Sequence, residues 1–197
     1  MTAIGYIRDR LAKLPEKAFV KVADMRGGPD GATKDAAIEQ AFSRLARGGV
    51  LLRVAKGLYW KGPNTRFGLV PPPLFEAALK VAQDRAPGAA GPSAAAFLGL
   101  TTQIPPTREF AVVGRETTRL PGVVFHERSN PKRDRLTPAE IAVLEIARDR
   151  LRYCEFSQEE TRVRLRALAA EGTIRLDQLR HAAAGEARYI MEFVGSL

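Results

Sequence analysis

The sequence has very little cysteine and histidine, with one Cys and two His among 197 residues. The single thiol, Cys154, excludes an intrachain disulfide and any metal site built from several thiolates. The two histidines, His126 and His181, lie far apart in the chain and have no spacing typical of a metal site or a catalytic triad. We therefore expect structural roles for all three residues, and neither a bound metal nor a cofactor.

Long apolar runs are also missing. A membrane-spanning helix needs roughly 18 to 20 consecutive, mostly apolar residues, and no stretch approaches that length. The first residues lack the basic and then apolar layout of a signal peptide. Hydrophobic residues nevertheless make up 45% of the chain, enough for one sizeable core or two small ones. The sequence therefore predicts a cytoplasmic protein with no membrane partner.

Motifs for catalysis are weak. Ser93 precedes an alanine run and is better explained as a helix N-cap than as a nucleophile. The run from Gly27 to Gly31 lacks the Lys-Ser/Thr ending and the preceding strand of a phosphate-binding loop. One acidic pair, Glu109 and Glu127, lies on or beside two expected strands. We expect no enzyme activity and no catalytic residues, and this pair is the alternative that a nuclease would require.

The positive charge is concentrated in the first third of the chain. The net charge is +9, and residues 1–66 hold 13 Lys and Arg against 6 Asp and Glu. Residues 67–197 are nearly balanced, with 18 basic against 16 acidic side chains. This asymmetry is typical of a nucleic-acid-binding module joined to a more neutral one.

Apolar spacing predicts three helices at the start of the chain. Apolar residues recur at helical intervals over residues 4–14, and a short second helix is expected over 19–25. The glycine-rich run 27–31 then forms a turn. A third, amphipathic helix is expected over 34–47, with Thr33 as its N-cap and Gly48-Gly49 as its end.

A tight hairpin is expected after the third helix, from strands at 50–54 and 58–60. Tyr59 and Trp60 alternate across the second strand, so we expect one of them in the core, packed on the third helix. Three helices followed by a basic hairpin are the ingredients of a winged helix-turn-helix.

The second domain is expected to be α+β and rich in helices. Proline-rich segments on both sides of residues 67–70 predict a boundary near residue 66, giving domains at 1–66 and 67–197. Expected elements are helices at 74–86 and 93–98, strands at 110–113 and 123–127, and two or three further helices.

Eight side chains are candidates for contacting DNA. Arginine can donate two hydrogen bonds to guanine and glutamine can pair with adenine, while lysine and serine can hold phosphate oxygens. The alternatives are an ordinary solvated helix face and a charged hairpin edge that prevents aggregation. The candidates are Lys34, Gln40, Ser43, Arg44 and Arg47 on the third helix, and Arg53, Lys56 and Lys61 on the hairpin.

Two segments of this region resemble a known family. The stretches AFSRLARGGV (41–50) and LRVAKGLYW (52–60) are similar to the winged helix of AbiEi-like antitoxins of AbiE-type (type IV) toxin–antitoxin systems, and of related uncharacterised regulators. The second domain resembles the same family through AAAFLGLTTQIP (94–105) and a C-terminal tail rich in Arg and Leu. Within residues 130–197 the likeness is one of composition only, and no motif matches. The shared wing pattern comprises Phe42, Ser43, Arg44, Leu45, Gly49, Arg53, Gly57 and Tyr59.

The resemblance implies an antitoxin that represses its own operon through the N-terminal domain. It also implies that the C-terminal domain counteracts a toxin of nucleotidyltransferase fold. For residues 99–105, a helix end with an extended exit is the alternative to a partner-binding role.

The residues themselves predict binding to double-stranded DNA, and the resemblance specifies DNA of the protein's own promoter region. A homodimer on an inverted repeat is one expected arrangement, and a monomer on repeated sites is another. The alternative function is a protein-interaction module whose winged helix docks a partner and has no specific DNA target.

Overall fold

A computed structural model describes residues 2–28, 31 and 33–197 and has an α+β architecture, as expected. The chain divides into two compact units, 1–81 and 82–197. None of the helices in the described residues is long and apolar enough to cross a membrane. Pro29 and Asp30 of the expected turn 27–31 lie outside the described residues.

Two packed helices form the base of the first unit. Helix α1 (Ala3–Ala12) begins where the Thr2 side chain accepts a hydrogen bond from the Gly5 backbone N–H. Helix α2 (Asp35–Arg47) follows the short 3₁₀ helix η1 (Val22–Met25). Apolar side chains from both α-helices are fully buried in one cluster, among them Ile7, Ile38 and Phe42.

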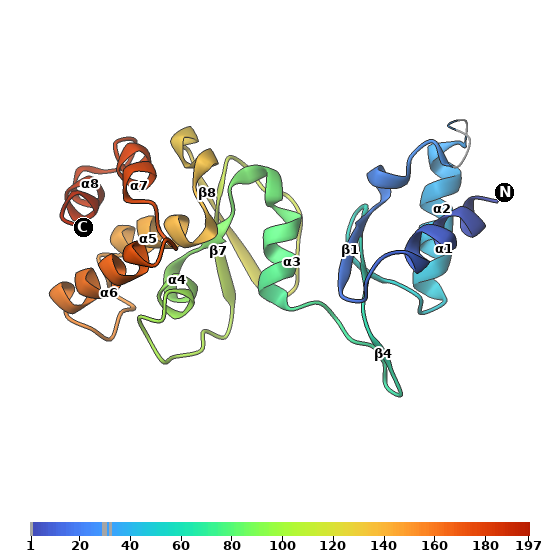
Figure 1. Cartoon of the computed structure of the whole chain (residues 1–197), viewed down its shortest axis with the longest axis horizontal. Helices are drawn as coiled ribbons and strands as arrows, with labels where there is room; N and C mark the ends of the chain where they lie inside the picture. Colours follow the sequence, from blue (N-terminus) through green and yellow to red (C-terminus); the bar gives the residue numbers. More distant parts are fainter. Residues whose placement is uncertain (1, 29–30, 32) are drawn as a thin grey trace. The chain divides into compact units, whose positions relative to one another are not determined.

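A three-stranded antiparallel sheet covers these helices (Figure 1). Its strands are β1 (Ala18–Lys21), β2 (Leu52–Ala55) and β3 (Leu58–Lys61), with β3 in the centre. The expected hairpin 50–60 is present as β2 and β3. The expectation of a helix over 19–25 is wrong in its first half, because Phe19 and Val20 pair with Trp60 and Tyr59 in the sheet.

One further local expectation about the first unit is wrong, and another is right for Tyr59 but incomplete for Trp60. Lys34, not Thr33, is the N-cap of α2, because Thr33 is drawn back into an isolated bridge with Gly27. Tyr59 and Trp60 are both buried, with 4% and 2% exposure. Tyr59 packs on Phe42 of α2, whereas the ring of Trp60 lies 4.7 Å from that of Phe19 on the neighbouring strand.

The first unit continues beyond the boundary expected near residue 66. A second hairpin, β4 (Asn64–Thr65) and β5 (Gly68–Leu69), follows β3 directly. The Trp60 indole Nε1 donates to the Val70 carbonyl at 2.9 Å, and this hydrogen bond ties the end of the second hairpin to the sheet. Helix α3 (Leu74–Val81) ends the unit, so the helix expected over 74–86 is shorter than predicted.

A three-stranded mixed sheet lies at the start of the second unit. Strand β7 (Arg108–Val113) pairs antiparallel with β6 (Gly88–Ala89) and parallel with β8 (Val123–Arg128). Helix α4 (Gly91–Phe97) connects β6 to the loop before β7. Ser93 is not its N-cap, because it lies within the helix and its Oγ accepts a hydrogen bond from the Glu109 backbone N–H at 3.0 Å.

Helices make up the rest of the second unit, in a larger number than expected. They are the 3₁₀ helices η3 (Gln83–Arg85) and η4 (Pro131–Arg135) and the α-helices α5 (Pro138–Arg148), α6 (Gln158–Ala170), α7 (Leu176–Ala183) and α8 (Arg188–Gly195). Helix α5 is the centre of this unit, since every residue from Ala139 to Ala147 is buried. Its start is fixed by a capping box between Thr137 and Glu140.

A buried ion-pair network joins four parts of the second unit. Glu145 of α5 accepts hydrogen bonds from Arg128 of β8 at 3.0 Å and from Arg133 of η4 at 2.6 Å. Glu186, in the turn before α8, accepts from Arg133 at 2.6 Å and also pairs with Arg148. The side chains of Arg133 and Glu145 are each 1% exposed. Charges this deeply buried are tolerated only because they are paired.

The network keeps its carboxylates ionised. Burial alone would raise the pKa of Glu145, but the hydrogen bond from Arg128 and the charge of Arg133 outweigh it, so its pKa lies below the ordinary range. Burial likewise opposes ionisation of Glu186, and the hydrogen bonds from Arg133 and Asn130 again hold its pKa low.

We predict that Glu145→Gln destabilises the second unit by about 3 kcal/mol or more, because it leaves buried guanidinium groups without their counter-charge. Urea unfolding of the whole chain followed by far-UV circular dichroism measures the loss, since most of the helices lie in this unit. Trp60, the single tryptophan, reports the first unit by fluorescence. Glu192→Gln, which breaks the exposed pair with Arg188, is the matched control and should have a much smaller effect. Equal effects of the two variants would contradict the prediction.

Acid should weaken the second unit for the same reason. Because the pKa values of Glu145 and Glu186 are lower in the folded than in the unfolded chain, the unfolded state binds more protons. Their contribution is complete above the ordinary glutamate pKa of about 4.3 and is lost as the pH falls through the lowered folded values. Urea midpoints can be measured by circular dichroism between pH 7 and pH 3. They should fall most steeply below the ordinary glutamate pKa, and the fall should be smaller in Glu145→Gln.

Candidate nucleic-acid interface

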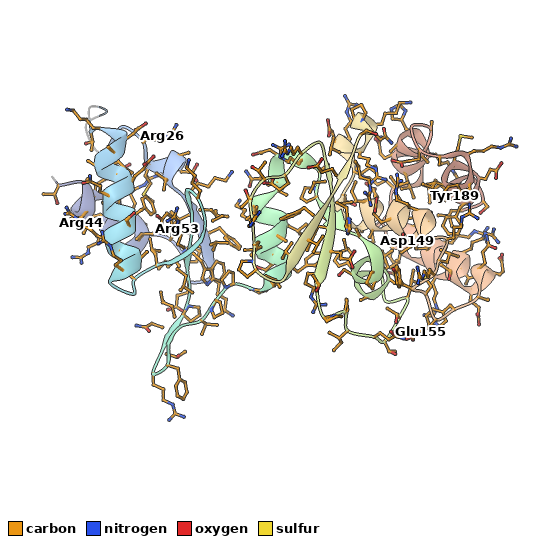
Figure 2. The ribbon with its side chains drawn as sticks, turned by 180° about the vertical axis from the view of Figure 1, so that it is seen from behind. Arg26, Arg44, Arg53, Asp149, Glu155 and Tyr189 are labelled. Carbon is orange, nitrogen blue, oxygen red and sulfur yellow. The ribbon has the colours of Figure 1, made fainter. Side chains whose placement is uncertain are left out.

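The outward face of α2 carries the polar candidates that the sequence indicates. Gln40, Arg44 and Arg47 are exposed and Ser43 is half-buried. Their spacing of three and four residues places them along one face of the helix, opposite the buried apolar face. The Nε of Arg47 donates to the Ser43 carbonyl at 3.4 Å, and Arg44 projects from the helix (Figure 2). The helix thus offers donors at fixed positions on a rigid support.

Two further cations lie at the beginning of α2. Lys34 is the exposed N-cap residue. Arg26, which follows η1, forms an ion pair with Asp35 at 3.4 Å, and both side chains are more than half exposed. Arg26 is absent from the sequence-based candidates because only the fold brings it next to the first turn of α2. An exposed pair of this kind exchanges easily for another anion.

The hairpin β2–β3 presents two of its three candidate cations. Arg53 is exposed on β2 and Lys56 is exposed in the turn before Gly57. Lys61 differs from the expectation, because its Nζ donates to the carbonyl oxygens of Leu11 at 2.8 Å and Leu14 at 2.6 Å. Lys61 therefore caps the C-terminal end of α1, and its ammonium group has a structural role in the first unit.

Acidic side chains are absent from a long part of this unit. Residues 40–75 contain no Asp or Glu, so no carboxylate within that stretch neutralises its cations. The basic residues of the stretch are Arg44, Arg47, Arg53, Lys56, Lys61 and Arg66. The cations of the C-terminal half of α2 and of the two hairpins should consequently attract a polyanion, although Asp35 and Glu39 lie in the first half of the helix.

The acidic pair expected for a nuclease is not brought together in the second unit. Register between β7 and β8 pairs Glu109 with Val124 and Val112 with Glu127. Because adjacent residues of a strand point to opposite faces, the two glutamates lie on opposite faces of the sheet. Glu109 instead contacts His126, with 2.7 Å between Oε2 and Nε2. Within the described residues, no group of three or more His, Cys, Asp or Glu side chains could hold a metal ion.

The segment 99–105 has a structural role in the second unit. The exposed carboxylate of Glu155 accepts hydrogen bonds from the Thr101 hydroxyl at 2.8 Å and from the Thr102 backbone N–H at 3.0 Å. These bonds hold the pKa of Glu155 below its ordinary value. The Glu155 backbone N–H in turn donates to the Leu100 carbonyl at 2.9 Å. Within the same segment, Ile104 is 82% exposed.

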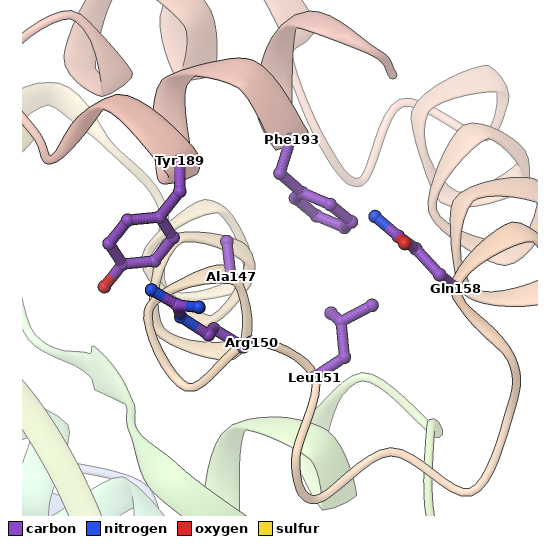
Figure 3. A pocket seen from close by; sticks show the side chains of 6 residues that line it. All are labelled: Ala147, Arg150, Leu151, Gln158, Tyr189 and Phe193. Atoms are coloured by element: carbon purple, nitrogen blue, oxygen red, sulfur yellow. The ribbon is translucent and has the colours of Figure 1, made fainter.

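A small cavity of about 220 Å³ opens between α5, α6 and α8 (Figure 3). Phe193 and Leu151 give it apolar walls, and the Arg150 guanidinium lies 4.8 Å from the ring centroid of Tyr189. Arg150 and Leu151 have left-handed backbone conformations, with φ of 53° and 61°. The sequence offers no signal for this cavity, because its residues come from three separate helices and a turn.

We predict that Lys61→Met destabilises the first unit by about 1–2 kcal/mol, because it removes a charged donor from the end of α1. Urea unfolding followed by the fluorescence of Trp60 measures the change. Lys56→Met is the matched control, since it removes the same charge from an exposed turn, and it should change stability by less than about 0.5 kcal/mol. A loss of stability in Lys56→Met as large as in Lys61→Met would contradict the assignment of Lys61 to the fold.

Comparison with known proteins shows a weak similarity to a solved structure. No model of a protein family matches the chain, and no curated protein does. The chain is similar to the crystal structure of the RV2827C protein from Mycobacterium tuberculosis, with a TM-score of 0.44 and 18% sequence identity. The match covers 98% of this chain and 75% of that one. Similarity at this level identifies neither a family nor a function.

Proposed function

We propose that the protein is a transcription regulator that binds double-stranded DNA sequence-specifically through its first unit, and that this unit is a winged helix-turn-helix. The observation that carries the proposal is the exposed face of α2, which presents Gln40, Arg44 and Arg47 to solvent; in the sequence these residues begin a stretch, 40–75, that lacks acidic residues. The element order α1, β1, η1, α2, β2, β3 and the sheet order β1-β3-β2 support it.

In this proposal α2 enters the major groove, which is wide enough to admit a helix. Arg44 and Arg47 donate to guanine edges and Gln40 pairs with adenine. Ser43 and Lys34 hold phosphate oxygens at the rim of the groove. The buried apolar face of α2 fixes the backbone that carries these groups, so binding orders their side chains but not the helix itself.

The hairpin β2–β3 acts as the wing. Arg53 and Lys56 contact the phosphate backbone or the adjacent minor groove. Lys61 is left out of the interface because both of its carbonyl partners belong to the C-terminal end of α1.

The antitoxin role is a proposal that rests on the family resemblance of residues 41–60 and 94–105. It assigns autorepression of the operon to the first unit and the counteraction of a nucleotidyltransferase-fold toxin to the second. A homodimer on an inverted repeat suits repression, because a two-fold axis in the protein then matches one in the DNA. We propose that the protein acts in the cytoplasm.

We predict that Arg44→Ala/Arg47→Ala lowers affinity for the cognate duplex at least about 30-fold, because each arginine–guanine contact contributes on the order of 1–3 kcal/mol. Fluorescence anisotropy with duplexes tiling the protein's own upstream DNA, each beside its scrambled counterpart, measures the change. Titrations at two salt concentrations should show a slope of about 0.9 in log affinity per neutralised phosphate.

The matched control is Arg152→Ala/Arg164→Ala, which removes two exposed arginines from the second unit. It lowers the net charge equally and should leave specific binding unchanged. Equal, weak binding of wild-type protein to every duplex would refute the regulator proposal and favour the protein-interaction alternative.

A further inference from the structure

The tip of the hairpin β4–β5 presents an aromatic ring to solvent. Phe67 is 85% exposed, the highest value among the exposed large hydrophobic side chains that the structure describes. The hairpin extends beyond the sheet β1-β3-β2 of the first unit (Figure 1). A side chain this exposed contributes nothing to the core, although hiding it from water would be favourable. Its position therefore suits a contact with a partner.

The hairpin tip is held in one conformation. The Thr65 hydroxyl donates to the Gly68 carbonyl at 2.9 Å and accepts from the Phe67 backbone N–H at 3.2 Å. Gly68 has φ of 102°, a conformation that a side chain would disfavour. At the base of the hairpin, the Val70 backbone N–H donates a hydrogen bond to the Pro63 carbonyl, and the Val70 carbonyl accepts one from the Trp60 indole. Because the turn is already ordered in the free protein, binding a partner loses little of its backbone conformational entropy.

A cation accompanies the ring. The Arg66 guanidinium carbon lies 4.6 Å from the centroid of Phe67, so the charge and the aromatic face form one unit. The pair belongs to the acid-free stretch 40–75 and has two neutral polar neighbours, Asn64 and Thr65. Charge complementarity therefore favours a polyanion over an apolar protein surface as the partner.

We propose that the hairpin β4–β5 is a second wing that enters the DNA minor groove, with Arg66 between the phosphate walls and Phe67 as a wedge at a base step. Proteins that bend DNA from the minor groove combine these two residue types, arginine in the groove and an apolar wedge that partly unstacks a step. The proposal rests on DNA binding by the first unit and adds to it a contact that distorts the duplex.

The test uses the whole chain and the duplex bound most tightly among those tiling its upstream DNA, labelled at both ends for energy transfer. Phe67→Ala should weaken binding about fivefold or more, fivefold being the low end for a base–aromatic contact, and should return the end-to-end distance toward that of free duplex. Phe67→Leu keeps an apolar wedge and should restore the bend. Arg66→Ala should lower the salt slope by about one.

Two controls make the outcome specific. Arg164→Ala removes a guanidinium that lies 3.7 Å from the ring centroid of Phe156 in the second unit, so it deletes the same kind of pair elsewhere and should change nothing. Netropsin, which occupies A·T-rich minor grooves, should reduce wild-type affinity to that of Arg66→Ala/Phe67→Ala. Thermal unfolding should be unchanged by both hairpin substitutions, because the side chain of Phe67 is almost fully exposed.

The second-wing proposal is overturned if Phe67→Ala and Arg66→Ala bind and bend the duplex as the wild-type protein does. It is also overturned if netropsin leaves the wild-type affinity unchanged. If Arg44→Ala/Arg47→Ala still abolishes specific binding in that case, the proposed function stands without it. If the wild-type protein prefers no duplex, both proposals fall together.

Discussion

Two buried carboxylates, Glu145 and Glu186, hold the second unit together. Glu145 pairs with Arg128 of β8 and Arg133 of η4, and Glu186 pairs with Arg133 and with Arg148 at the end of α5. Removing such charges from water is costly, and only the complete set of pairs offsets that cost. The network therefore fixes where β8, η4, α5 and the turn before α8 meet. The apolar residues of α5, which are buried on every side, fill the space so defined.

The first unit depends on apolar contacts. Phe42 of α2 packs on Tyr59 of the sheet. On the opposite face of the sheet, Phe19 packs on Trp60. Because the apolar half of α2 is fixed in this way, its polar half is presented to solvent at constant positions. The same indole that packs on Phe19 bonds to Val70, and so the core of this unit also anchors the second hairpin. In our proposals, DNA recognition follows from this rigidity, with donors on one helix and cations at the ends of two hairpins.

Much of the candidate interface could be predicted from the residues. The helix 34–47 and the hairpin after it follow from apolar spacing and glycine, and Gln40, Arg44, Arg47, Arg53 and Lys56 are exposed as expected. Lys61 could not be assigned correctly, because its partners are carbonyl groups of α1, about fifty residues earlier. Ser93 resembled an N-cap, but its hydroxyl is used to bind the backbone of β7. The residues around Phe19 do not show whether the segment forms a short helix or a strand, because the strand that pairs with it, β3, comes much later in the chain.

The sequence by itself determined the α+β class, the concentration of positive charge in the first third and the polar face of α2, because periodicity and charge are local properties. Tertiary structure decided the rest. It placed the end of the first compact unit at Val81, separated Glu109 from Glu127 across a sheet, and assembled the buried ion pairs. It also attached the hairpin β4–β5, which presents Phe67, to the buried ring of Trp60 through the Val70 carbonyl. These features depend on strand register and on contacts between distant segments, which no local pattern of residues specifies.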